Sequence, residues 1–283
     1  MDLNKDSNPR TARTAIVTGA SSGIGKAAAI KLAKAGFTVF PVARRLGEMA
    51  DLQELGCFPM KVDMNVEADI RALVAEVERI CGSVDVVVSN AADGALGPLE
   101  ETTVEAMRAQ FETNVFGPTL LTQLVVPAMR AKGSGRIIVV SSMGAEHTTP
   151  CSGSYHATKY ATNALADSWR FELRPFGIAY IIVQPAVVAT PMAHSGAQRF
   201  KERSTGLYGP LMLKMGQMAE TAIAKRQGVV SADDVADAIV HAATADKPKT
   251  RYRVGIAAHI LPAMRRYLPD RAYDAVWRRA FGQ

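Results

Sequence analysis

Short apolar runs alternate with longer stretches of helical pattern along most of the chain. The runs are rich in Val, Ile and Thr without strict polar alternation, which is typical of strands buried on both faces of a sheet. They predict strands at Thr14–Thr18, Thr38–Val42, Phe58–Val62, Val84–Ser89, Arg136–Ser141, Ile178–Val183 and Tyr252–Gly255. The stretches between them predict helices at Ile24–Ala35, Val66–Ile80, Val104–Arg130, Tyr155–Leu173 and Ala232–Ala243.

This alternation of strand and helix predicts a parallel sheet with helices on both sides. The chain has 283 residues, of which 48% are hydrophobic. That length suits one globular domain with a substantial core. No internal repeat, low-complexity block or linker divides the chain, so we expect a single domain over residues 1–283.

The three cysteines, Cys57, Cys81 and Cys151, show neither metal-ligand nor redox-pair spacing. We therefore expect reduced thiols, no metal site and a cytoplasmic protein. The polar N-terminus lacks the apolar run of a signal peptide. No run reaches the length of about 18 apolar residues that a membrane span needs.

A glycine-rich segment follows the first predicted strand and leads into a helix. It reads Thr-Gly-Ala-Ser-Ser-Gly-Ile-Gly over residues 18–25. Gly19 and Gly23 permit a tight turn and close approach to a pyrophosphate, while Gly25 lets the helix pack on the strand. The order of strand, loop and helix predicts dinucleotide binding. The fold expected is therefore α/β: one doubly wound Rossmann-type domain with a mainly parallel sheet of about seven strands and helices on both faces.

The end of the second predicted strand indicates which dinucleotide binds. An NAD site places Asp or Glu about 20 residues beyond the glycine loop, to accept hydrogen bonds from the ribose. Here Ala43 takes that position and Arg44 and Arg45 follow it. Two guanidinium groups suit the 2′-phosphate of NADP(H). We expect NADP(H), with NAD(H) less favoured; the alternative is that both arginines are ordinary surface charges at the start of a helix.

Tyr155 and Lys159 lie four residues apart on one helix face. A free tyrosine has a pKa near 10, which is too high for efficient proton transfer at neutral pH. A nearby cation favours the phenolate, so Lys159 is expected to lower the pKa of Tyr155. Ser142, at the end of the fifth strand, carries a hydroxyl that could hold a carbonyl oxygen.

The glycine segment, Ser142 and the Tyr155-His-Ala-Thr-Lys159 pattern together resemble the short-chain dehydrogenase/reductase family, in its hydroxysteroid- or retinol-dehydrogenase-like, NADP-preferring form. The resemblance covers the chain from Thr14 to about Gly255. It implies transfer of a hydride between NADP(H) and an alcohol or carbonyl, with catalytic residues Asn114, Ser142, Tyr155 and Lys159. Cofactor contacts are implied at Gly19, Ser21, Ser22, Gly23, Ile24, Gly25, Arg44, Arg45, Asp63, Met64, Asn90, Ala91, Tyr155, Lys159, Pro185, Val188 and Thr190.

The implied role of Tyr155 is general acid in reduction and base in oxidation. Lys159 would also bind the nicotinamide ribose, Ser142 would polarise the substrate oxygen, and Asn114 would support a water relay. Ala92 and Ala186 stand where the family pattern has glycine, so a slightly different backbone path is expected there. Neither replacement removes a reactive group.

Residues 191–226 break the alternation of strand and helix and are rich in Met and Gly. We interpret this insertion as a substrate loop over an apolar steroid-, retinoid- or lipid-like molecule. Packing of the same methionines onto their own domain explains them equally well. Nearby, His147 is expected to be a loop residue, His156 an exposed helix residue and Cys151 a small pocket-lining group.

Residues 256–283 form a helical extension in which Pro269 separates two short amphipathic helices. Residues 247–283 contain nine Lys and Arg but only two Asp, whereas the chain as a whole has a net charge of only +6. The extension could pack on its own domain, on a neighbouring subunit or on an anionic membrane surface. Packing on protein, either its own domain or a neighbouring subunit, is favoured over the membrane, and the resemblance implies a homo-dimer or homo-tetramer.

Other functions remain to be weighed against an oxidoreductase. A non-catalytic NADP(H) sensor on the same fold would be expected to have a broken catalytic set, whereas Ser142, Tyr155 and Lys159 are all present. Nucleic-acid binding would need a basic face or a recognised motif, and neither occurs in the sequence. Sugar epimerases and dehydratases on related folds usually have a different glycine spacing. The preferred partner is a small alcohol or carbonyl.

Overall fold

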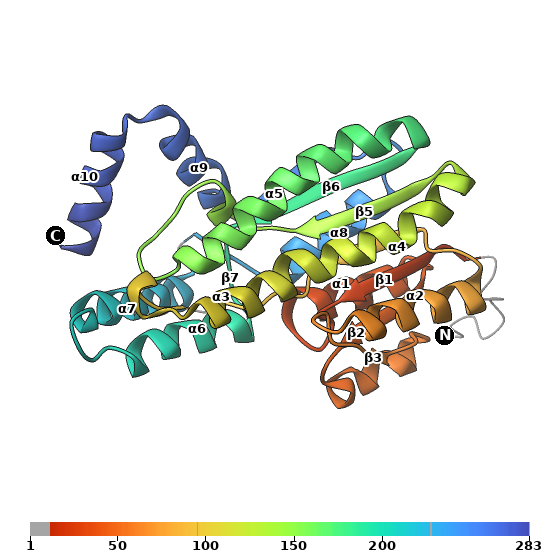
Figure 1. Cartoon of the computed structure of the whole chain (residues 1–283), viewed down its shortest axis with the longest axis horizontal. Helices are drawn as coiled ribbons and strands as arrows, with labels where there is room; N and C mark the ends of the chain where they lie inside the picture. The colour runs from red at the N-terminus through yellow and green to blue at the C-terminus, as the bar shows by residue number, and fades with distance from the viewer. Residues whose placement is uncertain (1–11, 95, 227, 283) are drawn as a thin grey trace.

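A parallel sheet of seven strands forms the centre of the protein (Figure 1). The computed structural model describes residues 12–94, 96–226 and 228–282, so the polar segment at 1–11 considered above lies outside the described residues. The strand order is β3-β2-β1-β4-β5-β6-β9. The strands are β1 (Thr14–Thr18), β2 (Thr38–Ala43), β3 (Met60–Lys61), β4 (Val86–Ser89), β5 (Gly135–Val140), β6 (Ile178–Pro185) and β9 (Arg251–Val254). The predicted α/β fold with a seven-stranded parallel sheet is confirmed.

Alternate residues of the strands pack into two separate cores. In β1, Ala15 and Val17 join one core, with residues of the helices at 23–34 and 232–244, whereas Ile16 joins the other core, with residues of the helices at 67–81, 117–132 and 153–173. Successive side chains of a strand point to opposite faces, so a strand covered on both faces is apolar throughout. This explains why the predicted strands showed no polar alternation.

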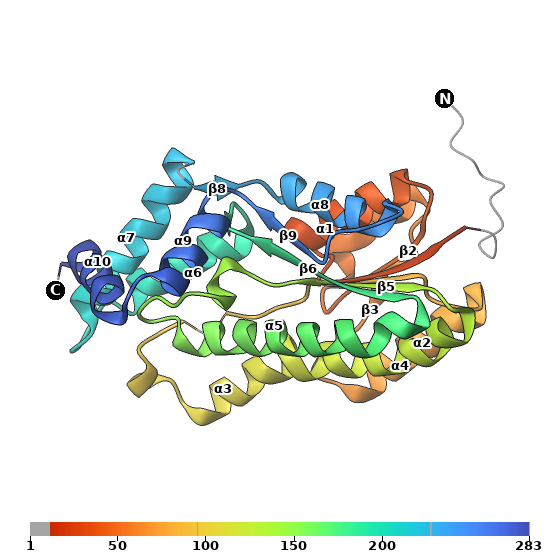
Figure 2. The ribbon, with the colours of Figure 1, turned by 90° about the horizontal axis from the view of Figure 1, so that it is seen from above.

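Helices cover both faces of the sheet, as Figure 2 shows. The face with α1 (Gly23–Lys34) and α8 (Ala232–Thr244) lies opposite the face with α2 (Glu67–Cys81), α4 (Gly117–Lys132) and α5 (Gly153–Leu173). Helix α8 begins with a capping box in which Ser231 and Asp234 bond each other's backbone N–H groups. Single-turn or longer 3₁₀ segments occur at Leu46–Leu55, Leu99–Glu101, Met143–Ala145 and Arg174–Phe176.

The predicted helix Val104–Arg130 is interrupted near its middle. It consists of α3 (Val104–Phe111), a π-helical segment at Glu112–Phe116, and α4. The cause lies in Pro118, which has no N–H to donate to the carbonyl of Asn114, four residues earlier. The N–H of Gly117 instead bonds the carbonyl of Glu112, five residues back. The prediction of one continuous helix was therefore wrong at the position of Asn114.

The insertion at 191–226 is more regular than its composition indicates. It forms α6 (Pro191–Glu202) and α7 (Gly209–Lys225), and a short ladder of β7 (Val187–Val188) with β8 (Val229–Val230) closes its base. Thr190 caps α6 by accepting a hydrogen bond from the N–H of Ala193 at 3.4 Å. Proline in the first turn of each helix fits a helix start, because its missing N–H would be unpaired there.

The C-terminal extension forms α9 (Ala257–Tyr267) and α10 (Asp270–Phe281), with Pro269 between them as expected. Figures 1 and 2 show α6, α7, α9 and α10 gathered at the same end of the molecule, beyond the carboxyl ends of the sheet strands. In parallel α/β sheets this is the end at which ligands bind.

Candidate functional site

The glycine segment joins β1 to α1 in the conformation that its sequence requires. Gly19 and Gly23 have positive φ angles of +68° and +56°, a region that favours glycine. A Cβ on Gly25 would lie 2.3 Å from the carbonyl oxygen of Gly19 and 2.5 Å from Nδ2 of Asn90. The loop therefore leaves the N-terminal turn of α1 open beside the end of β1, a geometry that suits an anionic ligand.

Thr18 and Asn90 hold the loop against the end of the neighbouring strand β4. The backbone N–H groups of Asn90 and Ala91 both donate to Oγ1 of Thr18 at 2.9 Å. Nδ2 of Asn90 donates to the carbonyl of Thr18 at 2.9 Å. From the sequence, Thr18 was considered only as the first residue of the glycine segment. Its position before Gly19 at the end of a buried strand was the signal that it could bridge two strand ends.

The residues after β2 and β3 lie at the same edge of the loop. Arg45 donates from Nη2 to Oγ of Ser21 at 3.1 Å and pairs through Nε with Glu48 at 2.9 Å. Arg44 is exposed. Asp63 accepts the N–H of Asn65 at 3.0 Å, while the neighbouring Met64 is buried. The structure thus brings one of the two predicted arginines into contact with the glycine loop.

Tyr155, Ser142 and Lys159 lie together where β5 meets α5. Oγ of Ser142 accepts the N–H of Gly144 at 3.0 Å. The Tyr155 side chain lies close enough to Ser142 for the serine hydroxyl to lower the pKa of Tyr155. Lys159 is 4% exposed and donates from Nζ to the carbonyl of Val140 at 3.0 Å. Its Nζ lies 5.8 Å from the centre of the Tyr155 ring.

Burial dominates the electrostatics of this group. Burial raises the pKa of Tyr155, and the hydrogen bond with Ser142 opposes that shift. Burial also lowers the pKa of Lys159 to about 8. Loss of solvation therefore outweighs the effect of Ser142 on the pKa of Tyr155, and the lowering of that pKa by Lys159 stays a prediction.

Asn114 occupies the π-helical segment and is almost fully buried. Its Oδ1 accepts the N–H of Asp93 at 2.8 Å, and its Nδ2 donates to the carbonyl of Asp93 at 2.9 Å and to Oγ1 of Thr158 at 3.0 Å. Its carbonyl accepts a long bond, of 3.4 Å, from Oγ1 of Thr162. The side chain is thus fully used in holding the loop after β4 against α5.

The segment from Pro185 to Thr190 follows β6 and returns to the glycine loop. A Cβ on Gly23 would lie 3.1 Å from Cγ2 of Thr190, so the first turns of α1 and α6 are neighbours. Val188 is buried in the core with α1 and α8. Neither Ala92 nor Ala186, the two alanines in glycine positions, has a positive φ angle, so both adopt ordinary backbone conformations.

The prediction that His156 is exposed was wrong. His156 is 6% exposed and His147 is 2% exposed. Both ring nitrogens of His156 are bonded, to the Gly144 carbonyl and to Thr149. Neither ring nitrogen of His147 has a partner among the described residues, and burial beside His156 lowers the pKa of His147 to about 4.

The insertion packs partly on itself and partly on the loop before α5. Cys151, Phe200 and Met212 form a small buried cluster, and Met215 packs against it. By contrast, Met192 is 47% and Met218 is 36% exposed. Two of the four methionines considered are therefore explained by packing on the domain, while two present apolar surface.

Helix α10 packs on the catalytic end of its own domain. The indole of Trp277 stacks on the imidazole of His147 with ring centres 6.0 Å apart and planes 5° from parallel. Tyr273 and Phe281 are buried. Ile256, which precedes α9, and Ile260 and Tyr267 on α9 remain exposed, as does Val276 on α10. Packing on its own domain thus accounts for Tyr273 and Phe281 of α10 and leaves part of both helices uncovered.

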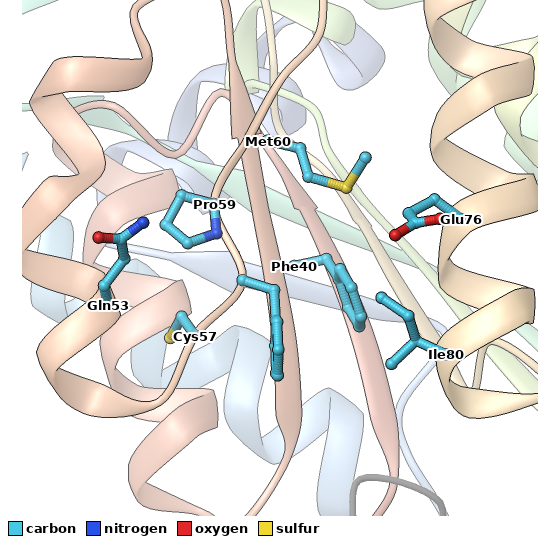
Figure 3. Close-up of a pocket in the computed structure, with 8 residues that line it drawn as sticks. Phe40, Gln53, Cys57, Pro59, Met60, Glu76 and Ile80 are labelled. Atoms are coloured by element: carbon cyan, nitrogen blue, oxygen red, sulfur yellow. The ribbon is translucent and has the colours of Figure 1, made fainter.

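A pocket of about 400 Å³ lies away from these residues, at the β3 edge of the sheet (Figure 3). The rings of Phe40 and Phe58 stack in it with centres 5.2 Å apart. Cys57 lines it, and burial raises the pKa of this thiol to about 11, which keeps it protonated and unreactive. None of the predicted site residues lines this pocket.

No helix in the parts of the chain that the structure describes has the length and apolar character needed to cross a bilayer.

Comparisons with known proteins agree with this geometry. Residues 13–200 match the family described as short chain dehydrogenase. The chain is 30% identical over 279 residues to the NADPH-dependent 3-dehydrocapnine reductase of Ornithobacterium rhinotracheale, covering 94% of this chain and 96% of that protein. It is also 30% identical over 296 residues to human 17-beta-hydroxysteroid dehydrogenase type 1, covering 96% and 87% respectively. A solved short-chain dehydrogenase from Streptomyces avermitilis is 29% identical, covers 98% of both chains and superposes with a TM-score of 0.78.

Proposed function

Because the chain belongs to the short-chain dehydrogenase/reductase family, we propose that it is an NADP(H)-dependent oxidoreductase that interconverts an alcohol and a carbonyl compound. The observation that carries this proposal is the meeting of Ser142, Tyr155 and Lys159 at the carboxyl end of the sheet. The glycine segment opens at the same end. A hydroxyl pair and a buried ammonium beside a dinucleotide loop are suited to proton transfer during reduction of a carbonyl.

The glycine loop fits a nicotinamide dinucleotide on the geometry of its own backbone. The contacts of Gly25 with Gly19 and Asn90 exclude a side chain. The N-cap residue Ser22 makes no side-chain cap bond to the first turn of α1, so the N–H groups of that turn suit a pyrophosphate. We assign the pyrophosphate to the loop from Gly19 to Gly25 and the nicotinamide end to Pro185, Val188 and Thr190. Asp63 and Met64, with Asn90 and Ala91, would border the adenosine.

The choice of NADP(H) over NAD(H) rests on Arg44 and Arg45. Arg45 already contacts Ser21 in the glycine loop, and Arg44 is exposed beside it. Ala43 leaves no carboxylate at the strand end to repel a 2′-phosphate. The reductase of Ornithobacterium rhinotracheale carries NADPH in its name, which supports the same choice.

When bound, the nicotinamide supplies or accepts the hydride. The Tyr155 hydroxyl would protonate the carbonyl oxygen in reduction and take up the proton in oxidation. Ser142 accepts the N–H of Gly144, so its own O–H remains to donate to the substrate oxygen, beside the Tyr155 hydroxyl. Lys159 is buried close to Tyr155. It would bind the nicotinamide ribose and bring positive charge to the phenolate.

Asn114 is assigned to the proton relay through its carbonyl rather than its side chain. Both polar atoms of the side chain bond Asp93 and Thr158. Pro118 leaves the carbonyl without its helical donor, and the bond from Thr162 is long at 3.4 Å. A carbonyl with spare accepting capacity at the base of α5 suits an ordered water that returns protons towards Lys159.

We further propose an apolar substrate, held beneath the insertion at residues 191–226. The side chains of Met192 on α6 and Met218 on α7 are exposed. These two helices and the helices of the extension, α9 and α10, gather at this end of the molecule. The resemblance to a relative named for hydroxysteroids supports a steroid-, retinoid- or lipid-like substrate.

A cytoplasmic homo-dimer or homo-tetramer is part of the same proposal. Cys57, Cys81 and Cys151 are all free, as expected in a reducing compartment. Phe171 on α5 is 69% exposed and Phe116, beside α4, is 53% exposed. Exposed aromatic side chains of this size are suited to burial between subunits.

The proposed activity is tested by following absorbance at 340 nm with NADPH or NADH against a panel of ketones, aldehydes and sugars. We expect oxidation of NADPH by at least one apolar carbonyl, and little or none by the Tyr155→Phe variant. NADH that outperforms NADPH would overturn the cofactor assignment. Absence of Tyr155-dependent turnover across the panel and the reverse reactions would contradict the catalytic proposal.

A further inference from the structure

His156 is the residue next to Tyr155 in α5, and it contacts the turn that carries Ser142. Its Nδ1 lies 2.8 Å from the carbonyl oxygen of Gly144. The N–H of the same Gly144 donates to Oγ of Ser142 at 3.0 Å. One glycine therefore connects the imidazole to the hydroxyl that meets Tyr155.

The approach between this turn and α5 is too close for a side chain. A Cβ on Gly144 would lie 2.4 Å from Nδ1 of His156. His156 lies on the buried face of α5 with Lys159 and Asn163, three and seven residues further along. The helix thus presents Tyr155 to the Ser142 hydroxyl and His156 to the backbone two residues beyond Ser142.

The hydrogen bonds of His156 define which nitrogen carries the proton. A carbonyl oxygen only accepts, so Nδ1 must donate to Gly144. In the neutral ring Nε2 is then an acceptor, and Oγ1 of Thr149 lies 3.1 Å from it, placed to donate. Burial lowers the pKa of His156 and so favours this neutral form.

We propose that His156 is a positioning residue: by bonding the Gly144 carbonyl, it holds the Ser142 turn at the distance from α5 at which Ser142 and Tyr155 contact the same substrate oxygen. This role rests on the proposed function and deepens it. It concerns the relative placement of two hydroxyl groups, which catalysis by oriented groups depends on to within a fraction of an ångström. The Thr149 hydroxyl fixes the tautomer that makes the bond.

Two amide substitutions of His156 test the roles of its two ring nitrogens separately. The amide nitrogen of Asn can replace Nδ1, so His156→Asn should keep the bond to Gly144 and retain kcat within about threefold. His156→Gln reaches the Nε2 position and His156→Leu makes neither bond. Both should lower kcat at least about tenfold, with KM and NADPH affinity changed far less.

A residue that served only stability would give another result. The three variants would then differ in melting temperature, while kcat per folded molecule stayed near that of the wild type. The proposal is overturned if His156→Leu keeps wild-type kcat, or if His156→Asn is impaired as severely as His156→Leu.

A measurement on the unaltered protein remains informative where a variant fails to fold or where no substrate is turned over. Ring-¹⁵N-labelled histidine NMR at pH 7 should show Nδ1 of His156 protonated and Nε2 unprotonated, and Thr149→Val should perturb only the Nε2 signal strongly. The opposite tautomer would overturn the positioning role. The expected tautomer together with absent turnover would overturn the proposed oxidoreductase function instead.

Discussion

Asn114 and Thr158 join the π-helical segment to the helix that carries the proposed catalytic residues. Nδ2 of Asn114 donates to Oγ1 of Thr158 at 3.0 Å, and that hydroxyl donates in turn to the carbonyl of Tyr155 at 2.7 Å. Thr158 is completely buried between Tyr155 and Lys159 in the sequence. The link therefore connects a local helix defect, caused by Pro118, to the placement of the site.

Thr158→Val tests this link because it removes one hydroxyl while keeping the shape of the side chain. Nδ2 of Asn114 loses one of its two acceptors, and a buried group left without a partner costs about 1–3 kcal/mol. We expect the free energy of unfolding to fall by that amount, measured by urea titration. Thr119→Val is the control, since its hydroxyl bonds only the carbonyl of Val115 in its own helix. Equal losses in the two variants would contradict the link.

Tyr155→Phe should lower turnover at least about 100-fold, the scale expected of general acid–base catalysis. The ring still packs beside His156, so NADPH affinity, measured by cofactor fluorescence, should survive. Tyr160→Phe is a matched control because Tyr160 lies on the same helix with 40% of its surface exposed. Near-normal turnover by Tyr155→Phe on a good substrate would remove Tyr155 from the mechanism.

Replacing Arg44 and Arg45 together with Ala should weaken NADPH far more than NADH, because only NADPH carries a 2′-phosphate. Each charged hydrogen bond lost corresponds to roughly tenfold or more in affinity. Titration calorimetry with the two cofactors gives the ratio directly. Arg108→Ala, at another exposed position, should leave both affinities unchanged. Tighter binding of NADH than NADPH by the wild type would contradict the assignment.

His147 predicts an acid-sensitive stability. Its pKa is lowered from 6.5 to about 4 by burial, so the unfolded chain binds a proton first as the pH falls. The free energy of unfolding is therefore highest above pH 6.5, where the ring is neutral in both states. It falls by about 3 kcal/mol in total as the pH decreases from 6.5 towards 4. His147→Phe keeps a ring against Trp277 and removes both unpaired nitrogens. Urea unfolding should therefore show that the free energy of unfolding of the variant, taken relative to that of the wild type, is higher at pH 5 than at pH 7.5.

His259→Phe makes the same chemical change at an exposed position of α9 and serves as the control. It should not alter the dependence of stability on pH between 7.5 and 5. A wild type and His147→Phe variant whose stabilities fall in parallel over this interval would show that His147 is not buried as a neutral ring.

The regular part of the fold follows from apolar pattern alone. The central strands β1, β2, β4, β5 and β6 are largely buried on both faces, so a Val- and Ile-rich run marks each of them without help from other residues. The edge strands β3 and β9 are partly exposed, and the predicted bounds of β3 differ from the observed ones at both ends. The π-helical segment required a different argument, from the proline that removes a donor to Asn114. That signal was present in the sequence, but an apolar pattern of helical period continues through it.

The site was predictable where a motif restricts the backbone and was missed where contact depends on tertiary packing. Gly25 is required by its close approach to the Gly19 carbonyl six residues earlier, so the spacing of the glycines sufficed to predict it. The burial of His156 follows from its place on the same helix face as Lys159 and Asn163. The spacing of His156 from these two residues could have indicated its burial. The same spacing could not have indicated that Gly144 and Thr149 bond the two ring nitrogens.

The insertion predicts which substrates the enzyme prefers. Met212 and Met215 pack against Cys151 and Phe200, so only the exposed Met192 and Met218 remain available to contact a substrate. Apolar burial contributes about 25 cal/mol per Å², so roughly 50 Å² lost from each side chain corresponds to about 1 kcal/mol, or fivefold in affinity.

We therefore expect a higher kcat/KM for bulky apolar ketones than for sugars or short hydroxy acids, and expect Met192→Ser with Met218→Ser to reduce that preference about 25-fold. NADPH affinity should not change, since neither methionine lies in the glycine loop. Leu207→Ser is the matched control, because Leu207 is 83% exposed in the turn between α6 and α7. A panel in which small polar substrates are preferred, or a double variant with the wild-type ranking, would show that these methionines do not contact the substrate. Loss of the preference in Leu207→Ser as well would point to a general loosening of the insertion instead of two specific contacts.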